Sequence, residues 1–295
     1  MTALTADKPT GIAGLWQSLN RKDRLWRRNP SLFYGIVVVG LVMLVAIFSR
    51  QLAPYDPVEQ DLRNILAPPS REHLLGTDNY GRDVFSRILC ATPLDLTVGV
   101  LSVVFPLLIG IVVGMISGYY GGVIDNIFMR LVDVVVAFPF MVLIIAMITV
   151  LGPGLMNVIV AVTIGSWIIY ARIVRGQVLV AKKLEYVMAA KMSGFSDMRI
   201  MMRHIMPNVV TTAVLFGALD VALDILLAAT LGFLGLGVQP PRPEWGAMIA
   251  EGRTFLVQAW WVSTFPGFAI VITGGGFTLL ADGLADVLRT STREV

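Results

Sequence analysis

Six apolar stretches, separated by polar or charged segments, constrain this 295-residue chain more than any other feature of its sequence. An α-helix needs roughly 20 apolar residues to cross about 30 Å of hydrocarbon. Because unpaired backbone groups are costly in lipid, helices are the expected way to span it. We therefore predict an all-α, polytopic membrane protein with six transmembrane helices. The expected spans are, in order, Leu32–Ser49 and about Leu96–Tyr119, Val132–Leu151, Met156–Ala171, Val209–Leu236 and Trp260–Ala281.

The composition agrees with a membrane protein and excludes several other classes. Hydrophobic residues make up 56% of the chain and charged residues 15%, whereas soluble domains have about 45–50% apolar and about 25% charged residues. The net charge of +3 is too small to indicate a nucleic-acid partner. With Cys90 as the single cysteine, intrachain disulfides and a cysteine-based metal cluster are both excluded.

The distribution of basic residues predicts the orientation in the membrane. With the N-terminus inside, the inner segments carry 16 Lys and Arg and the outer segments carry 7, so both termini are expected on the cytoplasmic side. Residues 1–31 then form a cytoplasmic segment whose part Gly11–Arg28 resembles an interfacial helix. Residues 32–49 form an uncleaved first span. Residues 50–95 form an extracytoplasmic loop.

Motifs for catalysis are absent from the sequence. There is no G-x-x-x-x-G-K-[ST], G-x-S-x-G or H-E-x-x-H pattern, and His73 and His204 are expected on opposite sides of the membrane. We predict no catalytic residue, no metal site and no cofactor on this chain, which is expected to be a conduit or scaffold and not an enzyme.

The expected cytoplasmic loop 172–208 is the most informative polar segment. Residues 185–194 read as a short helix ended by Gly194, and Pro207 interrupts the chain before the fifth span. Six methionines crowd this loop, and their flexible side chains suit a surface that repacks against a moving partner. The alternative is an interfacial helix whose methionines face lipid.

This loop resembles a family signature. Met188-Ala-Ala-x-x-x-Gly194, followed by nine residues and His204-Ile-Met-Pro207, is similar to the EAA loop of ABC-importer permeases, E-A-A-x3-G-x9-I-x-L-P. The glycine, the alanines and the proline carry the match, whereas Met188, His204 and Met206 depart from it.

Two further segments resemble one branch of that family. Leu75-Gly-Thr-Asp-x-x-Gly81-Arg82-Asp83-Val-Phe-Ser86-Arg87 is similar to a signature of dipeptide/oligopeptide/nickel-type permeases. Leu231-Gly-Phe-Leu-Gly-Leu-Gly237-x-Gln-Pro-Pro241-x-Pro-Glu-Trp245-Gly246 resembles the C-type subunit between its fifth and sixth spans. The matches cover about Ala53 to Asp286.

The resemblance implies a type I ABC importer permease fold and a binding-protein-dependent import machine in the bacterial inner membrane. Residues 93–286 would be the ABC type-1 transmembrane domain, and residues 287–295 a cytoplasmic tail. The implied partners are a second permease subunit, two cytoplasmic ATPases that bind ATP and Mg²⁺, an extracytoplasmic binding protein and membrane lipid. Coupling to the ATPase is expected from Glu185, Ala189, Ala190, Gly194, Arg199 and Pro207.

Two sets of residues inside the expected spans stand out. Gly110, Gly114 and Gly118 form a ridge that suits close helix packing, either within the chain or against the partner permease. Asp220 and Asp224 lie one helical turn apart on the fifth span. Charges at bilayer depth usually face a cavity or a partner. The pair is therefore interpreted as lining the pathway, with pairing to a neighbouring helix or a structural hydrogen bond as alternatives.

Outside the membrane, five residues are candidates for docking the binding protein or for an internal network of the loops. They are Asp78, Arg82, Asp83, Arg87 and Trp245.

Two rival functions follow from the sequence. One is a secondary transporter or channel that works without an ATPase, and the other is an intramembrane enzyme. A secondary carrier has no need of the 172–208 loop, and the enzyme lacks its motifs. Peptides are the expected cargo from the resemblance, but nickel, opines and sugar-derived compounds use similar permeases.

Overall fold

The structure is a computed structural model that describes residues 29–293, so the expected interfacial helix at Gly11–Arg28 lies outside the described residues. Within that range the regular elements are helices, and the only β-type pairing is a bridge between Thr77 and Asp83. This confirms the all-α prediction. The elements are α2 (Pro30–Ile47), α3 (Ser49–Leu52), α4 (Val84–Tyr120), α5 (Gly122–Val136), α6 (Phe140–Leu151), α7 (Leu155–Ala181), α8 (Glu185–Met192), α9 (Asp197–Arg199), the π-helix η1 (Ile200–Ile205), α10 (Met206–Phe233), α11 (Trp245–Gly252), the 3-10 helix η2 (Arg253–Phe255) and α12 (Trp261–Arg293).

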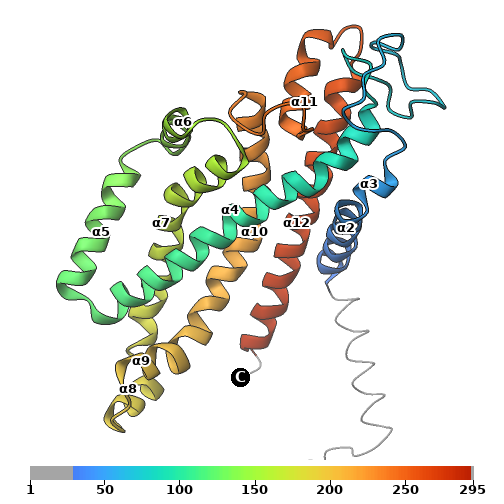
Figure 1. The fold of residues 1–295 in the computed structure, drawn as a ribbon. Coiled ribbons are helices and arrows are strands. Elements are labelled where there is room, and N and C mark those ends of the chain that lie inside the picture. The colour runs from blue at the N-terminus through green and yellow to red at the C-terminus, as the bar shows by residue number, and fades with distance from the viewer. Residues whose placement is uncertain (1–28, 294–295) are drawn as a thin grey trace, which may run out of the picture.

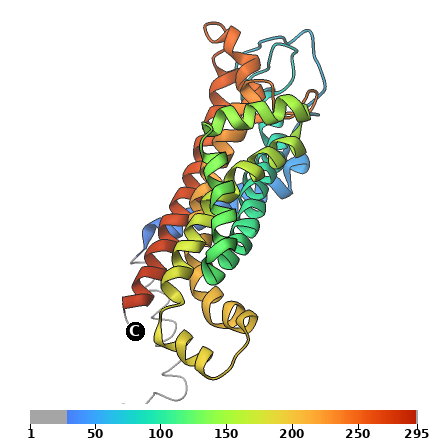
Figure 2. The ribbon, with the colours of Figure 1, turned by 90° about the vertical axis from the view of Figure 1, so that its left-hand side faces the viewer.

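The long helices form an elongated bundle (Figures 1 and 2). Five helical stretches in the described range are long and apolar enough to cross a membrane, and the bent pair of α5 and α6 makes a sixth candidate. These are the six expected apolar stretches, so the polytopic fold class is confirmed.

The second span is longer than expected. Helix α4 begins at Val84 and not near Leu96, and at 1.5 Å per residue it is about 55 Å long. The Asp83 carboxylate caps its start by accepting a hydrogen bond from the Ser86 N–H at 2.8 Å. The first turns of α4 carry polar residues, of which Arg87 and Asp95 are buried within the protein. Hydropathy alone therefore placed the helix start too late.

The third span is not one straight helix. Helices α5 and α6 meet at a bend of 88°, with Pro139 at the N-cap of α6. Proline has no N–H to continue the α5 ladder, and it drives the preceding residue out of the helical conformation. The expected single helix Val132–Leu151 was therefore wrong in shape, and its first half begins earlier, at Gly122.

The fourth and sixth spans also extend past their expected ends. Helix α7 continues to Ala181, so the first part of the expected 172–208 loop is helical, and α12 continues to Arg293. The polar residues in these extensions ended the apolar pattern but not the helix.

The bundle has two distinct ends (Figure 2). We name them the α11 end, where residues 53–83 and α11 gather, and the α8 end, where α8 and α9 extend beyond the long helices. The start of α2 and the end of α12 both lie toward the α8 end (Figure 1). A chain that crosses the membrane an even number of times has the start of its first helix and the end of its last helix on the same side.

Candidate functional site

The segment 182–205 connects α7 to α10 at the α8 end, and we name it the α8 loop. Helix α8 is held by its inner face. Val187 and Ala190 are buried in a cluster with Ile200, Met201 and Ile205 of the π-helix η1. Ala190 is only 6% exposed. Since that cluster also includes residues of α7 and α10, α8 is packed on both of the helices that it connects.

The outer face of α8 is exposed and largely apolar. Met192 is 90% exposed, and Tyr186 and Met188 are exposed beside it. Among the residues expected to couple to the ATPase, only Ala190 points inward. The others lie at the surface: Glu185, Ala189, Gly194, Arg199 and Pro207. The exposed methionines therefore lie on the side of α8 that faces away from the bundle.

Gly194 ends α8 through its backbone conformation. Its φ is +77°, a value that side-chain-bearing residues rarely adopt. The Phe195 N–H donates to the Ala190 carbonyl at 3.2 Å and the Gly194 N–H donates to the Lys191 carbonyl at 3.1 Å. This is the Schellman pattern of helix termination, so the glycine of the motif turns the chain from α8 toward α9.

Side-chain contacts connect the α8 loop to the bundle. The Tyr119 hydroxyl at the end of α4 donates to Asp197 at 2.7 Å, and Lys182 Nζ donates to the Gly118 carbonyl at 2.8 Å. Nearby, the Arg175 guanidinium on α7 makes two 2.6 Å hydrogen bonds to the Asp125 carboxylate on α5. Two side-chain hydrogen bonds therefore tie the α8 loop to the end of α4.

The glycine ridge on α4 faces α7 of the same chain. A Cβ atom added at Gly110 would lie 2.3 Å from Tyr170 Cβ, and one at Gly114 would lie 2.6 Å from the Ala171 carbonyl oxygen. At Gly118 the nearest atom would be Val178 Cβ at 2.8 Å. These glycines allow α4 and α7 to approach backbone to backbone.

The two acidic residues of α10 have different environments. The Tyr170 hydroxyl on α7 donates to Asp220 Oδ2 at 2.7 Å. Asp224 is 6% exposed, and in the described part of the chain its Oδ2 has no hydrogen-bond partner. A buried carboxylate oxygen that accepts no hydrogen bond costs free energy unless another group supplies a donor. The two carboxylates therefore differ, since Asp220 has a hydroxyl partner and Asp224 keeps one oxygen without a partner in the described residues.

At the α11 end the candidate docking residues are buried among themselves. Asp78 pairs with Arg82 Nε at 2.6 Å and with Arg87 Nη1 at 3.1 Å, and Glu251 on α11 pairs with Arg82 at 2.7 Å and with Arg87 at 3.0 Å. Asp83, besides capping α4, lies 3.0 Å from His73 Nδ1. This geometry is an internal loop network, and it ties the segment 53–83 to α11.

Trp245 is also buried, with 1% of its surface exposed. Its ring N–H donates to the Ile88 carbonyl at 3.3 Å, and its backbone N–H donates to Asp95 Oδ2 at 3.3 Å. The preceding Glu244 caps α11 by accepting from the N–H groups of Gly246 and Ala247, both at 2.8 Å.

Glu244 and Asp95 form a buried carboxyl pair that the sequence did not reveal. Both line a cavity of about 10 Å³ between α4, α7, α10 and the segment before α11, which has room for about one water molecule. Burial raises the pKa of the Glu244 carboxyl, although its two backbone hydrogen bonds act in the opposite direction. Burial therefore disfavours the charged form of the Glu244 carboxyl.

Other residues of the site were also missed, and each had a weak signal in the sequence. Glu251, Tyr170, Asp125 and Arg175 are isolated polar residues in or beside apolar stretches, but nothing in the sequence names their partners. Within residues 29–293 no group of three or more His, Cys, Asp or Glu side chains is arranged to hold a metal ion.

Comparison with protein families gives two matches. Residues 110–294 match the family model described as "Binding-protein-dependent transport system inner membrane component". Residues 23–69 match the model described as "N-terminal TM domain of oligopeptide transport permease C". Together the two matches cover most of the chain and leave residues 70–109 between them.

Curated relatives align over nearly the whole length. The chain is 43% identical over 266 residues to the glutathione transport system permease protein GsiD of Pectobacterium atrosepticum, covering 90% of this chain and 88% of the relative. It is 40% identical over 262 residues to the dipeptide transport system permease protein DppC of Alkalihalophilus pseudofirmus, with coverage of 89% and 86%. It is 42% identical over 260 residues to the probable D,D-dipeptide transport system permease protein DdpC of Escherichia coli, with coverage of 88% and 87%.

Proposed function

Because the chain belongs to the family of binding-protein-dependent transport system inner membrane components and is a permease subunit of such an importer, we propose that it forms one half of a pathway for short peptides. Permeases of this family are not enzymes, and separate ATPase subunits hydrolyse the ATP. The proposed assembly contains a second permease subunit, two ATPases that bind ATP and Mg²⁺, and an extracytoplasmic binding protein.

The proposed cargo follows from the names of the relatives. They are permeases for glutathione, for dipeptides and for D,D-dipeptides, which are all short peptides with charged ends. Asp224 is proposed to line the pathway, where its buried carboxylate oxygen, which has no partner in the described residues, suits a peptide ammonium group. Asp220 is proposed to support it from the same helix face through the Tyr170 hydrogen bond.

The proposed orientation places the α8 end in the cytoplasm. It rests on the excess of 16 basic residues over 7 on the side of the termini. The exposed face of α8 then lies where an ATPase can reach it. At the opposite side, the ion-pair network of Asp78, Arg82, Asp83 and Arg87 is proposed to hold residues 53–83 in shape for the binding protein.

The single observation that carries the coupling proposal is the two-sided structure of α8. Its inner face is anchored to α7 and α10 through Ala190, and its outer face exposes Met188 and Met192. We propose that the ATPase binds the outer face, with Glu185, Ala189 and Arg199 around it. Motion of the ATPase then moves two spanning helices through one short helix.

The proposal is tested by replacing Met192 with aspartate. The side chain is exposed, so folding is expected to survive, but a charge inside a protein interface costs about 2 kcal/mol or more. We expect the amount of ATPase that co-purifies with the variant to be at least about tenfold lower than with the wild-type permease. Leu62→Asp, at an apolar residue of the α11 end that is 69% exposed, is the control and should retain the ATPase.

Transport itself distinguishes the importer from its rival. The complete complex in proteoliposomes should take up labelled dipeptide only with ATP and a loaded binding protein. Uptake by this chain alone, without nucleotide, would instead establish a secondary transporter.

A further inference from the structure

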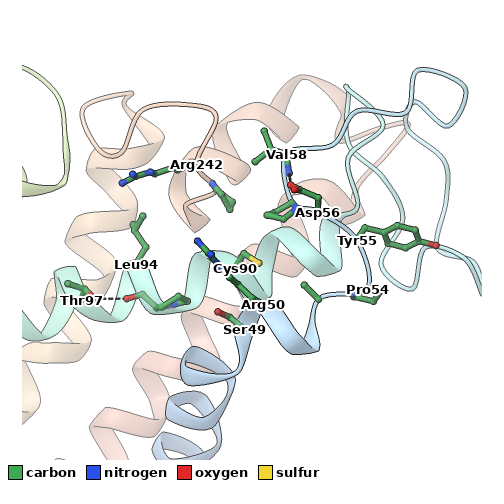
Figure 3. A pocket seen from close by; sticks show the side chains of 14 residues that line it. Ser49, Arg50, Pro54, Tyr55, Asp56, Val58, Cys90, Leu94, Thr97 and Arg242 are labelled. Carbon is green, nitrogen blue, oxygen red and sulfur yellow. Dashed lines mark hydrogen bonds between the residues drawn. The ribbon is translucent and has the colours of Figure 1, made fainter.

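A second site lies at the α11 end of the bundle, away from the α8 loop and from Asp224. A cleft of about 870 Å³ opens between α3, the first turns of α4 and the loop before α11. Figure 3 shows its lining, with Arg50 rising from α3 across α4 and Arg242 extending from the loop on the opposite side. We name this site the arginine cleft.

The two guanidinium groups of the arginine cleft are not neutralised by the protein. Arg50 and Arg242 are both exposed, and within residues 29–293 neither makes an ion pair or a side-chain hydrogen bond. The single acidic residue in the lining is Asp56, whose carboxylate accepts the Val58 N–H at 2.9 Å. The cleft therefore carries a net positive charge and offers guanidinium donors that suit phosphate oxygens.

The position of the arginine cleft corresponds to the headgroup region of a bilayer. Arg50 follows the 18-residue apolar helix α2 almost directly. That helix is about 27 Å long, close to the thickness of about 30 Å of the hydrocarbon core. A side chain just beyond its end lies where lipid phosphates lie.

An apolar surface continues from the cleft into the membrane. Leu94 and Thr97 of α4 line the cleft, and Val104, Leu108 and Val112 follow on the same helix face at spacings of seven, four and four residues. All three are exposed in this chain, with Leu108 at 55%. We name Thr97, Val104, Leu108 and Val112 the α4 stripe.

We propose that the arginine cleft binds the headgroup of an anionic phospholipid, with one acyl chain along the α4 stripe. The phosphate accepts hydrogen bonds from Arg50 and Arg242, and the excess positive charge favours a lipid with a net negative charge over a zwitterionic one. A soluble anion would use the arginines but leave the apolar stripe uncovered. The proposal depends on membrane embedding and not on the transported solute, whereas the identity of the leaflet as extracytoplasmic depends on the proposed orientation.

The test uses the complete complex in nanodiscs made of equal parts phosphatidylglycerol and phosphatidylethanolamine. The complex is extracted in mild detergent, and the retained lipids are counted by mass spectrometry. The Arg50→Gln/Arg242→Gln double variant should retain at least about tenfold less phosphatidylglycerol than the wild type, because charge-assisted hydrogen bonds to the phosphate are lost. Arg63→Gln/Arg71→Gln removes the same charge from exposed arginines outside the cleft and should change nothing.

A second variant tests the acyl-chain half of the site without changing any charge. Thr97→Trp places a large side chain where the stripe meets the cleft, and it should also lower the retained phosphatidylglycerol. Addition of soluble glycerophosphate should displace little lipid, because the headgroup alone lacks the apolar contact.

Three results would overturn the proposal. The first is equal phosphatidylglycerol in the wild type and the arginine double variant. The second is equal retention of phosphatidylethanolamine by the wild type. The third is lipid bound to the isolated permease but absent from the assembled complex, which would mean that a partner subunit covers the cleft.

Discussion

Asp220 and Asp224 lie one helical turn apart on α10, but their carboxylates have different surroundings. Asp220 has a hydroxyl partner in Tyr170, whereas Asp224 is buried with one oxygen unpartnered in the described structure. The difference was not visible in the sequence, because spacing places both carboxylates on one face but does not identify the helix that they meet.

For this pair we predict unequal effects of amide substitution on transport. Asp224→Asn should slow peptide uptake by about tenfold or more. This corresponds to a loss of about 1.4 kcal/mol of the free energy by which the carboxylate stabilises the peptide in the pathway. Asp220→Asn keeps an amide oxygen to accept from Tyr170 and should have a smaller effect. Uptake by reconstituted complexes measures both, with assembly checked by size-exclusion chromatography. Wild-type uptake by Asp224→Asn would contradict a role in the pathway.

Glu244 provides a prediction about pH. Burial raises its pKa above the ordinary value of 4.5, so the folded protein holds this proton more tightly than the unfolded chain does. The stabilisation is complete below the ordinary pKa and is lost as the pH rises through the raised value. The thermal unfolding midpoint of the wild type should therefore fall as the pH rises, and Glu244→Gln should make that fall smaller.

The matched control for that experiment is Glu72→Gln, since Glu72 is an exposed residue of the neighbouring segment 53–83. The control should keep the pH profile of the wild type. An unchanged profile in Glu244→Gln would mean that this carboxyl does not titrate in the measured range. The variant is also expected to lose about 1 kcal/mol of stability at low pH, because an amide has only one oxygen to cap the two N–H groups.

At the scale of elements, the sequence revealed the spanning helices more clearly than their ends. Apolar residues mark lipid or core contact, so the six stretches were found. The first turns of α4 contain Arg87 and Asp95, whose burial depends on Glu251 and Trp245 more than 140 residues away in the chain. No local pattern contains that information. Pro139 indicated a break, but no sequence pattern gave the 88° angle between α5 and α6.

The contact between α4 and α7 gives a prediction at this scale. Gly114→Val should prevent the two helices from packing, because even its Cβ would lie 2.6 Å from the Ala171 carbonyl oxygen. Overpacking costs about 1–3 kcal/mol and more where backbone cannot move. We expect a strongly reduced yield of folded protein by fluorescence-detected chromatography. Gly40→Val on α2, where a Cβ meets nothing within 4 Å, should fold normally.

At the scale of the whole molecule, the basic-residue count predicts the side on which each end of the bundle lies. The test uses a Cys90→Ala background with single cysteines at Met192 or Leu62, both exposed residues. A membrane-impermeant thiol reagent applied to intact spheroplasts should label Leu62→Cys and spare Met192→Cys. Permeabilisation should expose the second site. The reverse pattern would invert the orientation and remove α8 from the reach of any cytoplasmic ATPase.

The length of α4 has a consequence for the assembled importer. This helix is about 55 Å long. One end is joined to the segment 53–83 and to α11 by the contacts of Asp83 with His73 and of Arg87 with Asp78 and Glu251. The other end is joined through Tyr119 to the segment beside α8. A rod that pivots near its middle moves its tips in opposite directions, by about 2 Å for a tilt of about 5°. We therefore expect that docking of a loaded binding protein on one surface reaches the opposite surface through the tilt of this single helix, with no chain of side-chain rearrangements through the hydrocarbon.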